Sequence, residues 1–134
     1  MSKWKSLEFV RLGSSFKMQE VLAQINIHCK NFVALAITRA IIGKDEASAI
    51  VTLVPNIQFL GLRSAKFMEK ENLVMILQGC KNLVQFDVRD CIGFDEGDDE
   101  ILKLASHITT FEHEGSRLSR RCIVDCSIYD FMFD

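Results

Sequence analysis

The sequence predicts an α/β fold in which about five short strand–helix units repeat and stack into an arc. Two observations lead to this prediction. The pattern apolar-x-x-apolar-x-apolar occurs five times, and its copies begin 28, 25, 26 and 25 residues apart. The intervals between the copies carry apolar residues at helical spacing. No proline- or glycine-rich linker interrupts the 134 residues, so a single domain is expected.

Each copy of the pattern predicts a short strand, because apolar residues alternate with residues that would face outward. The copies are Trp4, Leu7 and Phe9; Phe32, Leu35 and Ile37; Ile57, Leu60 and Leu62; Leu83, Phe86 and Val88; and Ile108, Phe111 and His113. The last copy is the weakest, since a histidine takes its third apolar position.

Each interval between strands predicts a helix with one apolar face. Seven residues before the four later copies stand Ile25, Ile50, Ile76 and Ile101. Ten residues before them stand Leu22, Ala47, Leu73 and Asp98. Offsets of ten, seven, six and three residues share one side of a helix. Acidic residues precede several of these segments, as expected near helix N-termini.

One such unit cannot bury both its strand and its helix, so neighbours must stack around a continuous core. Right-handed crossovers give a parallel β-sheet. Because helices are wider than strands, we expect the sheet on the concave face and the helices on the convex face. The predicted repeat domain spans residues 1–115, and residues 116–134 break the pattern and form a C-terminal tail or cap.

Composition argues against several classes of partner. A formal net charge of −2 gives no reason to expect nucleic acid or an anionic membrane. The longest apolar run, around residues 47–54, is too short to cross a bilayer. The N-terminal residues lack the apolar core of a secretory signal, so we expect a cytoplasmic or nuclear protein. Five cysteines cannot all pair within one chain, which favours reduced thiols.

No motif predicts catalysis, a metal or a cofactor. The chain lacks a glycine-rich phosphate loop, a G-x-S-x-G elbow and an H-E-x-x-H pair. The acidic run at 94–100 lacks the spacing of an EF-hand loop and is expected to begin a helix. Cys29, Cys80 and Cys91 take inward positions, where cysteine acts as a small apolar residue. The pair Cys122 and Cys126 lacks the second ligand pair of a zinc site.

The fourth unit, residues 83–108, resembles the cysteine-containing subclass of leucine-rich repeats (LRRs). Its start, Leu83-x-x-Phe86-x-Val88-x-x-Cys91, is similar to the Leu-x-x-Leu-x-Leu-x-x-Cys start of that subclass. The wider stretch resembles plant F-box/LRR-repeat proteins, the substrate receptors of SCF-type cullin–RING ubiquitin ligases. The resemblance covers about residues 4–115 and implies a leucine-rich-repeat solenoid.

The F-box itself has no room before Trp4, where the first predicted strand begins. The resemblance therefore implies recognition of a protein substrate or partner. Assembly with the Skp linker and a cullin is expected only if an F-box is supplied elsewhere. With no cap before its first strand, the isolated chain is expected to be marginally stable or to associate.

The outward positions of the predicted strands form a candidate partner-binding surface on the concave face. Its expected members are Phe59, Arg63, Gln85, Asp87, Arg89 and Glu112. Aromatic and arginine side chains are enriched at binding hot spots. A plainer interpretation is that the arginines only pair with Asp87, Asp90 or Glu112 on a solvated sheet, and that Phe59 packs under a loop.

Three functional hypotheses follow. The first is a non-catalytic protein-binding module, the substrate-recognition part of an F-box/LRR receptor. The second is a small-ligand receptor, since some similar plant proteins sense hormones in a pocket above the arc. That pocket needs long loops after the strands, and the 25- or 26-residue spacing leaves little room for them. The third is a decoy or scaffold without an F-box.

Overall fold

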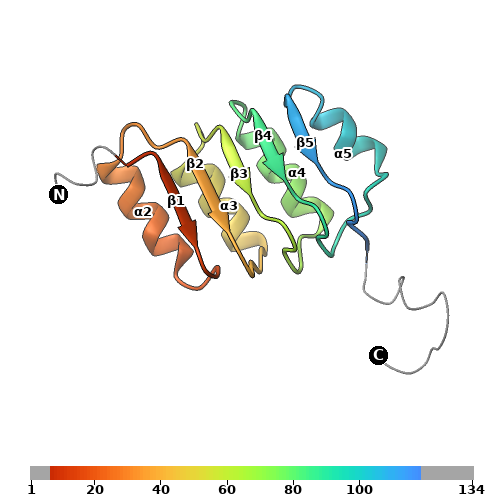
Figure 1. The fold of residues 1–134 in the computed structure, drawn as a ribbon, viewed down its shortest axis with the longest axis horizontal. Coiled ribbons are helices and arrows are strands. Elements are labelled where there is room, and N and C mark those ends of the chain that lie inside the picture. Colours follow the sequence, from red (N-terminus) through yellow and green to blue (C-terminus); the bar gives the residue numbers. More distant parts are fainter. Residues whose placement is uncertain (1–6, 119–134) are drawn as a thin grey trace.

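The computed structural model describes residues 7–118, which fold as one parallel sheet with helices on one side. Within that range the strands are β1 (Phe9–Leu12), β2 (Ala34–Ile37), β3 (Phe59–Gly61), β4 (Gln85–Asp87) and β5 (Thr110–Glu112). They lie side by side in sequence order. The helices between them are α2 (Met18–His28), α3 (Lys44–Leu53), α4 (Lys70–Gly79) and α5 (Asp99–Leu104). The predicted α/β class and parallel sheet are confirmed (Figure 1).

The helices cover one face of the sheet and leave the other face open (Figure 1). The four isoleucines predicted on the buried side of the helices are at most 1% exposed. Opposite them, the central strand residues Leu35, Leu60 and Phe86 are at most 2% exposed. Burying one such side chain contributes roughly 1.5–3 kcal/mol relative to leaving it in water. The helical periodicity of the sequence therefore corresponds to a real core face.

The acidic run at 94–100 begins α5, as expected. The carboxylate of Asp98 accepts hydrogen bonds from the backbone N–H groups of Glu100 and Ile101, at 3.0 and 3.2 Å. Asp98 is thus the N-cap of α5. It is not a core residue, although it stands where other units have an apolar residue ten positions before the next strand. No group of three or more histidine, cysteine, aspartate or glutamate side chains suited to a metal occurs in residues 7–118.

The first strand lies three residues later than the sequence pattern suggested. Phe9 pairs with Ala34, and Val10 pairs with Leu35. The inward residues are therefore Leu7, Val10 and Leu12, whereas the predicted set was Trp4, Leu7 and Phe9. Both sets fit the apolar pattern, but only the observed set keeps the 25-residue spacing to the next strand.

This shift changes which residues of β1 face the open side. Phe9 and Arg11 face the open side, where a strand with Trp4, Leu7 and Phe9 inward would have placed Ser6 and Glu8. Val10 packs against the core. From β2 to β5 the observed pairing follows the predicted positions.

A turn with positive φ follows each of the last four strands at the same place in the repeat. Its residues are Arg39, Ser64, Asp90 and Gly115, with φ between 54° and 81°. The left-handed conformation turns the chain away from the sheet toward the next helix. It also leaves the preceding side chain, such as Arg63 or Arg89, at the rim of the open face.

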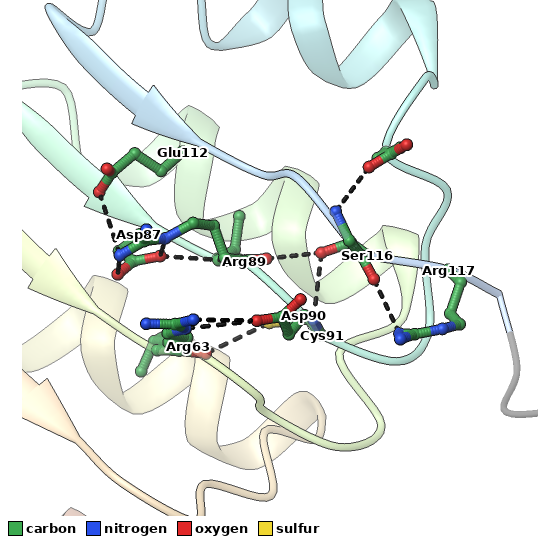
Figure 2. Close-up of polar contacts among 12 residues, drawn as sticks. Arg63, Asp87, Arg89, Asp90, Cys91, Glu112, Ser116 and Arg117 are labelled. Atoms are coloured by element: carbon green, nitrogen blue, oxygen red, sulfur yellow. Dashed lines mark hydrogen bonds and ion pairs between the residues drawn. The ribbon is translucent and has the colours of Figure 1, made fainter.

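Ser116 and Arg117 continue to contact the preceding unit (Figure 2). Ser116 is 3% exposed; its hydroxyl donates to the carbonyl of Val88 at 2.6 Å and accepts from the N–H of Cys91 at 3.1 Å. Arg117 pairs with Ile92 in a parallel bridge. The rest of the predicted tail, including Cys122 and Cys126, lies outside the described residues.

Cys29, Cys80 and Cys91 are all buried and carry free thiols. Burial raises the pKa of Cys80 to about 11 and that of Cys91 to about 12. The Cys91 thiol also donates to the carbonyl of Leu62 at 3.2 Å. These protonated thiols pack as apolar residues, as the repeat pattern predicts. None of the helices in residues 7–118 is long and apolar enough to cross a membrane.

Candidate binding face on the open side of the sheet

The open face presents side chains in rows that cross the strands. The first row is Phe9, Ala34, Phe59, Gln85 and Thr110. The second is Arg11, Ala36, Gly61, Asp87 and Glu112. A third row lies where the strands end and contains Thr38, Arg63, Arg89 and Glu114. Because a parallel ladder fixes these rows, side chains far apart in sequence become neighbours.

The β1–β3 side of this face is apolar. Phe9 and Phe59 are 49% and 40% exposed, and Ala34 lies between them in the same row. Ala36 and Gly61 lie beside them in the second row; a Cβ placed on Gly61 would be 3.5 Å from that of Ala36. We call Phe9, Ala34, Ala36, Phe59 and Gly61 the apolar patch. Arg11 borders it, with its guanidinium 5.8 Å from the centre of the Phe9 ring.

The β4–β5 side carries a cluster of charged side chains (Figure 2). Arg89 donates from Nε and Nη2 to the two carboxylate oxygens of Asp87, at 3.0 and 2.9 Å. Its Nη2 lies 3.9 Å from the carboxylate of Glu112. Arg63 donates through Nε and Nη2 to Asp90, both at 3.3 Å. We call Arg63, Asp87, Arg89, Asp90, Glu112 and Glu114 the charged cluster.

The Asp87–Arg89 pair is the best defined part of the charged cluster. Burial raises the pKa of Asp87, but the hydrogen bonds from the side chain and backbone of Arg89 outweigh it and hold the pKa below its ordinary value. Hydrogen bonding to Asp87 raises the pKa of Arg89. Both groups are therefore charged at neutral pH. The two parallel hydrogen bonds orient the guanidinium group relative to the Asp87 carboxylate.

The predicted site residues share this face, but they do not all touch. Asp87, Arg89 and Glu112 come together, whereas Arg63 pairs with Asp90. Gln85 is exposed between Phe59 and Thr110. The ion pairs of the plainer interpretation are thus present, although exposed pairs of this kind contribute only about 0–1 kcal/mol. Phe59 does not pack under a loop of the described chain, since 40% of it stays exposed.

Sequence reasoning missed two members of the face, Phe9 and Arg11. The spacing contained the missing signal, since Leu7 lies 25 residues before Phe32 whereas Trp4 lies 28 before it. A strict period would have moved the first strand by three residues and placed both side chains outward.

A separate hollow lies where the chain passes from strands to helices. Its volume is about 660 Å³, and its lining includes Lys66, Phe67, Lys70, Ile92 and Leu118. The ammonium group of Lys70 is already bound by Asp98 at 3.2 Å and Glu100 at 2.9 Å. Lys66 is exposed and has no ion pair with the described part of the chain.

Searches against protein-family models, curated proteins and solved structures return no match to this chain.

Proposed function

We propose that the chain is a leucine-rich-repeat solenoid that binds a protein partner through the open, concave face of its sheet. In this proposal it is the substrate-recognition part of an SCF-type F-box/LRR ubiquitin ligase receptor. It does no chemistry itself. Assembly with Skp and a cullin depends on an F-box supplied elsewhere.

The regular pairing of the strands supports the repeat assignment. Equivalent residues of neighbouring strands are 25 or 26 positions apart throughout the sheet. Cys91 takes the buried position that the cysteine-containing subclass reserves for cysteine, and its thiol bonds to the preceding unit. A parallel sheet in sequence order, with every helix on one side, is what stacked repeats produce.

The observation that carries the binding proposal is the half-exposed Phe59 beside the charged cluster. An exposed aromatic side chain contributes strongly to binding free energy when a partner buries it, because its apolar area is large. Neighbouring charges then select the partner and orient it. The core residues lie on the helical side of the sheet, so the side chains of the open face are not needed to form the core and can contact a partner.

Affinity capture from plant extract followed by mass spectrometry tests the proposal. The bait is the 134-residue chain, compared with its Phe59→Ala variant. Phe16→Ala is the matched control, because Phe16 is 78% exposed and does not lie on the open face. We expect a partner that the chain and the control recover and Phe59→Ala loses. Equal recovery by all three baits would refute binding through the open face.

The hollow beside Phe67 favours a second candidate, a small-ligand receptor. Its lining combines apolar side chains with the carboxylates of Glu69 and Glu71 and with the ammonium group of Lys66, which has no ion pair within residues 7–118. Phenylacetate, a small aryl carboxylate, tests whether Lys66 binds an anionic ligand in this hollow. Phenylacetate should then raise the thermal midpoint of the chain, and Lys66→Ala should abolish the rise. No shift at millimolar phenylacetate would refute this candidate.

A further inference from the structure

The open face changes character from one end of the sheet to the other. Its β1–β3 side is the apolar patch, and its β4–β5 side is the charged cluster. We propose that the partner, whose binding rests on the function proposed above, presents an extended segment with an aliphatic or aromatic residue and a lysine or arginine about four positions apart. The apolar side chain covers the patch, and the cation meets Glu112 and Glu114.

The apolar patch suits a single large side chain. Phe9 and Phe59 flank Ala34 in one row, so their backbones are two strand spacings, about 10 Å, apart. Ala34, Ala36 and Gly61 carry little or no side chain between them. A partner side chain above Ala34 would therefore contact both phenyl rings and remove apolar surface from water.

The charged cluster has an excess of negative charge that no other cation of residues 7–118 neutralises by an ion pair. It contains four carboxylates, Asp87, Asp90, Glu112 and Glu114, and two guanidinium groups. Each arginine is hydrogen-bonded to one aspartate. Glu112 has only the long 3.9 Å contact with Arg89. Glu114 is exposed, and its carboxylate forms no hydrogen bond or ion pair within residues 7–118.

These two glutamates are therefore the available acceptors. Each ionised carboxylate offers about four lone-pair positions, so Glu112 and Glu114 can accept several N–H donors from one lysine or arginine. Both lie at the same end of β5 and its extension, two residues apart and on the same side. Within the charged cluster, an anion would instead meet two arginines whose best donors are already occupied.

The distance between the two regions sets the spacing in the partner. Across the strands, from Ala34 on β2 to Thr110 on β5 is three strand spacings, or about 14 Å. Glu112 lies two residues, about 7 Å, farther along β5, a distance that the long side chain of a lysine or arginine covers. An extended chain advances about 3.3 Å per residue, so roughly four residues cover the distance across the strands. The segment would cross the strands above Gln85 and Thr110, whose exposed polar side chains can bond to its backbone.

Selection from a phage-displayed library of random dodecapeptides on the immobilised chain tests this pattern. We expect enriched peptides to carry Leu, Ile, Met or an aromatic residue with Lys or Arg three to five positions away. Enrichment of acidic peptides, or of apolar peptides without a cation, would overturn the inference.

Variants of the chain then locate the bound peptide. Phe59→Ser should abolish binding of a selected peptide, and Phe16→Ser should not. Glu112→Gln/Glu114→Gln should weaken it roughly fivefold at low salt and flatten its salt dependence, because two screened ion pairs are lost. The matched control is Glu20→Gln/Asp45→Asn, which removes two exposed carboxylates from the helical side and should leave affinity within twofold.

The outcomes separate the two proposals. Peptides that need Phe59 but not the two glutamates would overturn the inference and keep the proposed function. A library that yields only peptides insensitive to Phe59→Ser would overturn both. Far-ultraviolet circular dichroism of each variant, matched to the unmodified chain, ensures that lost binding is not lost folding.

Discussion

Ser116 provides a sharp test of where the folded repeats extend, because its hydroxyl is buried and makes two hydrogen bonds. It donates to the carbonyl of Val88 and accepts from the N–H of Cys91. Ser116→Ala would leave both backbone groups without a partner at a site that is 3% exposed. Each buried unsatisfied group costs about 1–3 kcal/mol. We expect the free energy of unfolding to fall by about 2–4 kcal/mol.

Urea unfolding at 25 °C, followed by circular dichroism, measures this difference. Ser106→Ala is the control, because Ser106 is exposed and its hydroxyl forms no hydrogen bond with the described residues; its effect should stay within about 0.5 kcal/mol. A loss below about 1 kcal/mol for Ser116→Ala would refute the reasoning, since it would mean that water reaches both backbone groups in the folded chain.

Three further predictions concern the core and its turns. His113→Leu should raise the free energy of unfolding by about 1 kcal/mol, because the imidazole Nδ1 is buried without a hydrogen-bond partner in the described chain; an unchanged or lower urea midpoint would contradict this. Gly93→Ala should destabilise by at least about 3 kcal/mol, because φ is 137° and the new Cβ would overlap backbone of the preceding unit. Gly13→Ala, with nothing within 4 Å, should be nearly neutral in the same assay, and equal effects would refute the clash. Stability should also fall as the pH rises above about 9, because the Cys80 and Cys91 thiols lose their protons at about 11 and 12 when folded but near 9.0 when unfolded. Each thiol lowers the free energy of unfolding by up to about 1.4 kcal/mol per pH unit in this range. The urea midpoint of the Cys80→Ala/Cys91→Ala variant should therefore decline less steeply with pH than that of the unmodified chain. Parallel declines would contradict the assignment.

The periodic apolar residues predicted most of the fold because they are the part of the sequence that packing constrains. Ile25, Ile50, Ile76 and Ile101 repeat since each must fill the same space between a helix and the sheet. The apolar pattern did not predict the register of the first strand correctly. Among residues 7–118 it lies at the edge of the sheet, where β2 is its one neighbouring strand. Two sets of residues fit the apolar pattern, and the 25-residue spacing to the next strand, which corresponds to the pairing with β2, distinguishes them.

From β2 onward the sequence predicted which residues lie on the open face, but it did not predict which of them contact one another. Strand alternation places Arg63 and Arg89 outward, yet it does not say which carboxylate each arginine meets. Asp90 meets Arg63 because it adopts a left-handed turn, with φ 58°, that a strand pattern does not reveal. Asp87 meets Arg89 because residues two apart on a strand share a face.

That internal pairing decides which charge the open face can recognise. A phosphate or carboxylate on a partner would have to compete with Asp87 for Arg89, and the lowered pKa of Asp87 keeps this competitor ionised even in mild acid. Displacing it would leave a partly buried carboxylate without its cation, which costs more than an exposed pair returns. Glu112 and Glu114 impose no such cost on an incoming cation, because neither is engaged by a short hydrogen bond within the described chain. The two arginines of the charged cluster therefore act mainly to hold Asp87 and Asp90 in place, and the selectivity of this cluster is for positive charge.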